Sequence, residues 1–94
     1  MATIDVKTEE DSERGWRFGV GVTDGGAEQT FDVTLSWSDY DLWSHGQVPP
    51  ERVVRAAFEF LLQREPVGAI LRKFDCAVIR RYFPDVDKAL PKLL

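Results

Sequence analysis

Two eight-residue segments with alternating apolar and polar side chains constrain the fold of this chain more than any other feature. They read WRFGVGVT at residues 16–23 and TFDVTLSW at residues 30–37. Period-two alternation is typical of a strand with one face in a hydrophobic core and the other in water. Asp24-Gly25-Gly26 lies between them and suits a hairpin turn. The segments therefore predict an antiparallel hairpin whose apolar face needs a cover.

The N-terminal residues add a shorter candidate strand and an acidic segment. Ile4 and Val6 alternate with polar residues, which predicts a third strand over residues 3–7. The acidic segment at residues 8–15 follows, and we expect it to be a mobile loop.

The second half of the chain has the periodicity and the end signals of helices that would cover this sheet. Residues 38–46 predict a short helix that ends at Gly46. Residues 48–65 predict the main helix, with Pro50 at its first position and Pro66 preventing its continuation. Its apolar stripe is wide, which predicts contacts with both the sheet and the following helices, or with another subunit.

Two further helices and a tail complete the expected architecture. Residues 67–74 predict a short helix, and residues 75–83 predict a second one with Asp75 as its N-cap. Residues 85–94 are expected to form a last turn or a frayed tail. The expected fold is a single α+β domain over residues 1–94, in which three to four helices pack on one face of a two- or three-stranded antiparallel meander. Its strand region is 1–37, and its helical region is 38–84.

The residue inventory argues against catalysis and against a cofactor or metal site. His45 is the only histidine and lies at an expected helix end, where it would interact with exposed carbonyls. Cys76 is the only cysteine, so a disulfide framework and a multi-cysteine metal site are excluded. A Cys76 thiol activated at a helix start is the remaining enzymatic alternative. The acid pairs, which are Asp39/Asp41 and Asp85/Asp87, are expected to be solvated.

Glycines in the first strand segment are a separate candidate feature. The spacing of Gly19 and Gly21 does not continue into a dinucleotide-binding fingerprint, because Asp24 occupies the third glycine position. Both glycines lie on the polar face of their strand, which leaves a flat strip that a backbone or a partner could approach.

Charge is distributed unevenly along the chain. Residues 1–47 carry ten acidic and three basic side chains, whereas residues 48–94 carry six acidic and nine basic ones. The basic half predicts a surface patch for a partner or for nucleic acid, formed by Arg64, Arg72, Lys73, Arg80 and Arg81. The connection between the two helices expected there is too short for a standard helix-turn-helix, and the chain lacks asparagine, a common reader of adenine. Nucleic-acid binding would therefore be weak and salt-sensitive.

The stretch FEFLLQREPVGAILRKFDCAVIRRYFP, residues 58–84, resembles a family of small bacterial proteins of unassigned function. That family carries the pattern F-x-F-L-L-x-R-E, then I-L and F-D, and finally Y-F-P. The resemblance implies a bacterial cytosolic domain and assigns no activity or site residue.

Together these features predict a non-enzymatic protein-interaction module that binds another protein or itself. Aromatic residues and arginine are enriched where interfaces gain most of their affinity. Trp16 and Trp43 are the aromatics expected nearest the surface. Weak nucleic-acid binding, or a regulatory role, through the basic residues is the alternative. A cytoplasmic location with no membrane span and no cofactor is expected, because the chain has no apolar run of roughly 20 residues and its N-terminus is acidic.

Overall fold

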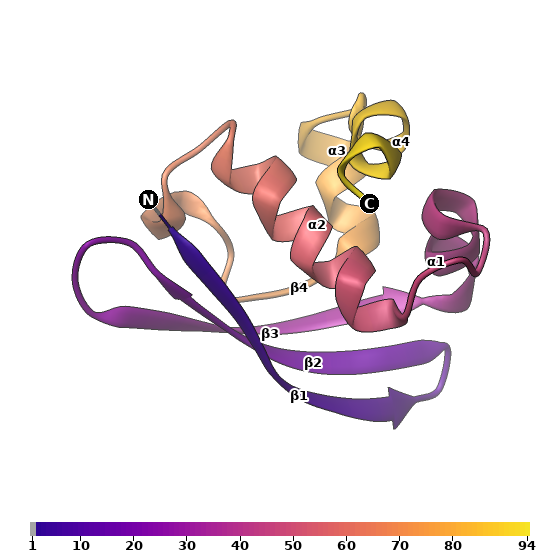
Figure 1. Ribbon diagram of the computed structural model, residues 1–94, viewed down its shortest axis with the longest axis horizontal. Helices are drawn as coiled ribbons and strands as arrows, with labels where there is room; N and C mark the ends of the chain where they lie inside the picture. The colour runs from indigo at the N-terminus through magenta and orange to yellow at the C-terminus, as the bar shows by residue number, and fades with distance from the viewer. Residues whose placement is uncertain (1) are drawn as a thin grey trace.

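A four-stranded sheet with all helices on one of its faces forms the architecture of residues 2–94, the part that this computed structural model describes (Figure 1). The strands are β1 (Thr3–Ser12), β2 (Gly15–Thr23), β3 (Glu28–Ser36) and β4 (Lys73–Asp75). They lie in the order β1-β2-β3-β4. The first three are antiparallel neighbours, and β4 runs parallel to β3. The α+β class is confirmed, whereas the sheet is mixed and has four strands instead of the expected two or three antiparallel ones.

Four α-helices and three short 3-10 turns cover the sheet. The helices are α1 (Trp37–Ser44), α2 (Pro50–Leu62), α3 (Ile79–Tyr82) and α4 (Val86–Ala89). The 3-10 turns are η1 (Val67–Ala69), η2 (Cys76–Val78) and η3 (Leu90–Leu93). Helix α2 lies across the sheet, and α1, α3 and α4 surround it on the same side (Figure 1). Within residues 2–94, every helix falls short of the length and apolar character that a membrane span requires.

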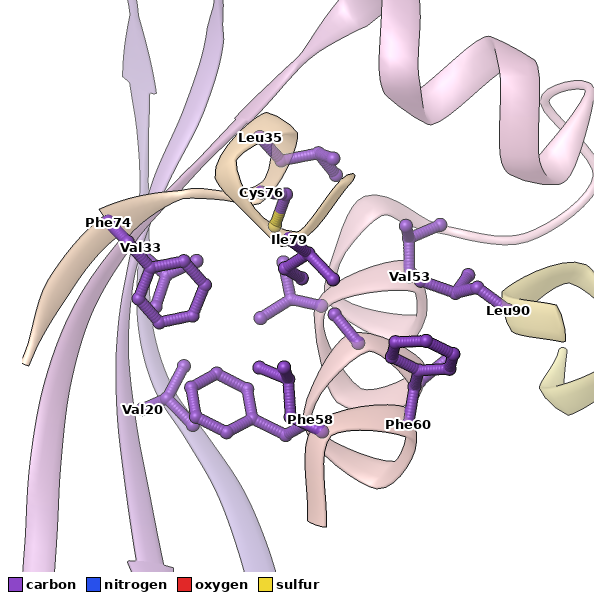
Figure 2. Close-up of a cluster of buried hydrophobic side chains, with 14 of the residues drawn as sticks. Val20, Val33, Leu35, Val53, Phe58, Phe60, Phe74, Cys76, Ile79 and Leu90 are labelled. Carbon is purple, nitrogen blue, oxygen red and sulfur yellow. The ribbon is translucent and has the colours of Figure 1, made fainter. Parts of the chain in front are cut away.

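The period-two segments form β2 and β3 because their apolar side chains share one face. The buried members of that face are Phe18, Val20, Val22, Phe31, Val33 and Leu35. Helix α2 packs on them through side chains that include Phe58, which is fully buried (Figure 2). Burying an aromatic side chain of this size stabilises the fold by about 1.5–3 kcal/mol. The opposite face of the sheet is polar and carries the ion pair between Arg17 and Asp32.

The wide apolar stripe of α2 is covered within the chain. Phe58 faces the sheet, while Val53 and Phe60 lie on the side of α2 that faces Leu90 (Figure 2). The Phe60 ring also meets the Phe83 ring edge-on, with 6.0 Å between their centroids. The stripe therefore contacts both the sheet and the following helices, as one of the two sequence alternatives predicts.

The acidic segment at residues 8–15 does not form the mobile loop that was expected. Strand β1 passes through a bulge at Lys7 and continues along β2 as far as Ser12. Pairing satisfies backbone groups that β2 would otherwise leave open on this side. Thr8 adds a further bond, since its Oγ1 accepts from the Gly19 amide at 2.9 Å.

Residues 67–74 do not form the predicted helix. They form η1 and then enter β4, where the Arg72 carbonyl accepts a hydrogen bond from the Asp32 amide at 2.8 Å. The parallel strand satisfies backbone groups on the outer edge of β3, and it places Phe74 beside Val33 in the core. The predicted N-cap is correct, because the Asp75 carboxylate accepts from the Ala77 amide at 2.9 Å.

The last ten residues are folded rather than frayed. They form α4 and η3, and both Val86 and Leu90 are fully buried. Val86 and Leu90 belong to the core, and Ala89, Leu93 and Leu94 of the same segment pack against it.

Candidate protein-docking pocket

An apolar pocket of about 160 Å³ lies where the C-terminal end of α2 meets β4 and α3. Its walls combine α2, the segment through η1, β4 and the helical turns that follow it. The apolar side chains of these walls include Leu61, Ile70, Phe74, Val78, Ile79 and Phe83. The pocket thus occupies the segment in which the sequence contains its densest mixture of aromatic and basic residues.

Local sequence explains how the pocket forms. Pro66 lies four residues after the end of α2 and turns the chain away, so that η1 crosses to the edge of the sheet. Strand β4 then places Phe74 in the core, where its ring lies 5.9 Å from that of Phe58. Ile79, at the start of α3, is also buried. The floor of the pocket is therefore part of the packed core and is rigid.

The rim of the pocket is apolar and exposed. Leu71 is 50% exposed and Tyr82 is 65% exposed, and both line the opening. Glu65 is the charged side chain among the lining residues. A dry cavity of roughly 150 Å³ lined by aliphatic and aromatic side chains holds a benzene-sized group. This pocket has room for one aromatic or large aliphatic side chain and offers it apolar contact.

The five basic residues singled out in the sequence do not gather into one free patch. Arg64 pairs with Asp85, and its guanidinium lies 3.7 Å from the centre of the Phe60 ring. Arg80 is bound by two carboxylates. The remaining cations, Arg72, Lys73 and Arg81, are exposed and make no ion pair with another residue in 2–94.

Two of these three cations, Arg72 and Lys73, lie on opposite sides of the sheet. The Arg72 guanidinium lies 5.7 Å from the centre of the Phe31 ring, which belongs to the helix-covered side of the sheet. Lys73, the first residue of β4, contributes to the polar side together with Arg17 and Asp32. Successive strand residues face opposite sides, so these two cations cannot act on one surface. Arg81 precedes Tyr82 at the pocket rim.

A polar network outside the pocket joins three helices, and the sequence analysis did not predict it. The Arg80 guanidinium donates to Asp87 of α4 at 2.8 and 2.9 Å and to Asp39 of α1 at 3.0 Å. These bonds favour the ionised carboxylate and lower the pKa of Asp87. Asp39 is only 7% exposed, so the expectation that the acid pair Asp39/Asp41 is solvated is wrong for Asp39. Nothing in the spacing of residues 39, 80 and 87 indicates that they meet.

The tryptophans occupy different positions from those expected. Trp43 is 1% exposed, and its indole nitrogen donates to Asp87 at 2.9 Å, so its assignment to the surface is wrong. Trp16 is half-buried and meets Tyr40 edge-on at 5.1 Å. Trp37 is instead 58% exposed. The period-two pattern places Trp37 inward, but β3 ends one residue earlier and α1 begins at Trp37.

The lone cysteine and histidine do not form a nucleophile pair. Cys76 is fully buried, and burial raises the pKa of its thiol far above the ordinary range. His45 is exposed and caps the end of α1 in a left-handed conformation with φ 54°, donating its amide to the Asp41 carbonyl. Within residues 2–94, no three His, Cys, Asp or Glu side chains lie together in a way that would hold a metal ion.

The glycine strip on the polar face is already occupied. A Cβ atom on Gly19 would lie 2.5 Å from Thr8 Oγ1. Gly21 lies under the ion pair between Lys7 and Glu28, whose charged atoms are 2.5 Å apart. Neighbouring side chains therefore fill the space that the sequence left for a partner backbone.

Comparisons with known proteins add no assignment. No protein-family model, no curated protein and no solved structure matches this chain. The resemblance of residues 58–84 to a bacterial family stays a prediction, and the pocket is interpreted from its geometry.

Proposed function

We propose that this chain is a non-enzymatic protein-interaction module whose pocket receives an apolar side chain of a protein partner. The observation that carries this proposal is the pocket itself, a concave apolar site with a buried floor and an exposed rim of Leu71 and Tyr82. Interfaces gain most of their affinity where aromatic or aliphatic anchors fill such pockets and water is excluded.

Rigidity of the floor supports the proposal. The rings of Phe31, Phe58 and Phe74 form a continuous row, with centroid separations of 5.2 and 5.9 Å. Ile79 is only 3% exposed and closes the floor from α3. A preformed site loses little side-chain freedom when a partner binds, so more of the contact energy appears as affinity.

The chemistry of the pocket supports binding rather than catalysis. Its lining offers one carboxylate, Glu65, and the phenol of Tyr82, while the Cys76 thiol is buried and protonated. The proposal includes the bacterial cytoplasmic setting that the resemblance implies. Nucleic-acid binding through the basic residues is less favoured, because Arg64 and Arg80 are bound to carboxylates within the chain.

Selection from a random peptide library tests the proposal. Peptides with an aromatic or large aliphatic anchor should be enriched on the natural chain and should fail to bind Leu71→Asp. Leu42→Asp is the matched control, since Leu42 is 49% exposed but lies on α1. Enriched peptides that bind Leu71→Asp as well as the natural chain, or no enrichment at all, would contradict the proposal.

A further inference from the structure

We infer that the partner is a second copy of this chain and that its Trp37 fills the pocket. The inference rests on the proposed function and names the occupant of the same site. Within residues 2–94, four large apolar side chains remain well exposed. Trp37 and Leu42 belong to α1, whereas Leu71 and Tyr82 form the pocket rim.

These two exposed groups belong to different parts of the fold. Helix α1 lies beside the N-terminal end of α2, where the Tyr40 hydroxyl donates to the Val48 carbonyl (Figure 1). The pocket borders the C-terminal end of α2 at Leu61 and Glu65. Trp37 is not among the residues that line the pocket, and its ring packs against Trp16 of β2, so a chain does not fill its own pocket with Trp37.

Trp37 has the properties of a preorganised anchor. Its amide donates to the Arg14 carbonyl at 2.9 Å, which fixes its backbone to the turn between β1 and β2. Its ring meets Trp16 edge-on with 6.5 Å between centroids. More than half of the side chain is nevertheless exposed. An aromatic side chain held in this way suits an apolar pocket of about 160 Å³.

Charges around the two groups are complementary. Asp41 follows Trp37 by one helical turn, and Glu13 and Arg14 form the turn to which the Trp37 amide is bonded. Arg72 and Arg81 flank the rim residues of the pocket, where Glu65 is the one acid. The Trp37 end is thus mainly negative and the pocket end mainly positive. None of these six side chains is in an ion pair with another residue of 2–94, so they are free to meet a second copy.

The arrangement predicts head-to-tail association. Trp37 and the pocket are different surfaces, so the contact does not use the same patch on both copies. Such contacts add one copy after another until a ring closes or a filament forms. The average mass in solution should therefore rise steadily with concentration rather than stop at a dimer.

Sedimentation of two variants and their mixture tests this inference. Trp37→Ser removes the anchor but keeps the pocket, and Tyr82→Asp blocks the pocket but keeps the anchor. Each alone should lose association by at least about 30-fold, as expected for truncation of a central aromatic contact. Their equimolar mixture should form a one-to-one complex that does not grow, because it contains one intact pair of surfaces.

Three results would overturn the inference: a natural chain that stays monomeric up to about 1 mM, Trp37→Ser that associates like the natural chain, or a mixture that stays at monomer mass. If library peptides still bind the pocket in those cases, the proposed function stands with a different protein as partner. Both side chains are exposed, and thermal unfolding checks that each variant folds. Leu71→Asp provides a second pocket-blocked variant should Tyr82→Asp be unstable.

Discussion

Arg80 in α3 and Asp87 in α4 form a two-point ion pair, with Nε 2.9 Å from Oδ2 and Nη2 2.8 Å from Oδ1. The same carboxylate accepts from the buried Trp43, and the same guanidinium donates to the buried Asp39. This network joins three short helices, α1, α3 and α4. Short helices are marginal on their own, so such tertiary contacts hold them in place.

Arg80→Ala should lower the free energy of unfolding by about 2–3 kcal/mol, because it leaves the Asp39 carboxylate buried without its cation. Urea denaturation measures this change. Arg81→Ala is the matched control, since Arg81 is exposed and unpaired within residues 2–94, and it should change stability by less than about 0.5 kcal/mol. Equal effects of the two substitutions would contradict the structural role of Arg80.

Stability should fall as the pH drops below about 4. The pKa of Asp87 is lowered in the folded state, chiefly by its hydrogen bonds with Arg80. The folded chain therefore holds this proton less tightly than the unfolded chain, so the stabilisation is present above the ordinary pKa of about 3.9 and is lost as the pH falls through the folded value. Urea denaturation between pH 7 and pH 2 should show a smaller loss for Asp87→Asn.

Some of the acid sensitivity should persist in Asp87→Asn, because Arg17 lowers the pKa of Asp32 in the same direction. An identical pH dependence in Asp87→Asn and the natural chain would show that the network does not contribute.

Gly15→Ala should destabilise the chain by about 1–3 kcal/mol through steric conflict in the hairpin. A Cβ atom at residue 15 would lie 2.0 Å from the Leu35 carbonyl oxygen, which is backbone and cannot rotate away. Gly26→Ala is the control, because a Cβ atom there meets nothing within 4 Å and the loss of unfolded-state freedom favours folding. Thermal unfolding should separate the two variants, and a stable Gly15→Ala would contradict the close strand approach.

The Cys76 thiol should resist iodoacetamide in the folded protein at neutral pH. Burial removes access to the sulfur and also raises the pKa of the thiol, so little of the reactive thiolate exists. Unfolding in urea should expose it to rapid labelling. Mass spectrometry counts the labelled chains, and rapid modification of the folded protein would restore the reactive-thiol alternative.

Features encoded by local periodicity could be predicted from the sequence. The alternating segments predict β2 and β3, and Pro50 marks the start of α2 correctly, whereas α2 ends at Leu62, three residues before the predicted end at residue 65. Strand β4 was mistaken for part of a helix because its three residues are stabilised by pairing with β3, a partner about 40 residues away. The extension of β1 was missed for the same reason, since charged residues on an edge strand carry no apolar period.

In the candidate site, too, local periodicity predicts some features, whereas others depend on residues far away in the sequence. Apolar periodicity predicts that Ile70, Phe74 and Ile79 are buried, and they form the pocket floor. The same periodicity also places Leu71 in the core, which is wrong because Leu71 is 50% exposed. The exposure of Trp37 depends on where β3 gives way to α1, a boundary that the continuous alternation through residue 37 conceals. The burial of Trp43 depends on Asp87, which lies 44 residues along the chain. Long-range partners of this kind are not visible in a single sequence.

The most direct test of the account is a dilution series of the natural chain followed by ¹H–¹⁵N correlation spectra. Specific docking of Trp37 into the pocket predicts concentration-dependent shifts of the Trp37 indole and of amides at Leu71, Phe74 and Tyr82, and predicts that Trp37→Ser abolishes them. Spectra that do not change with concentration, or shifts confined to the polar face around Arg17 and Asp32, would contradict it.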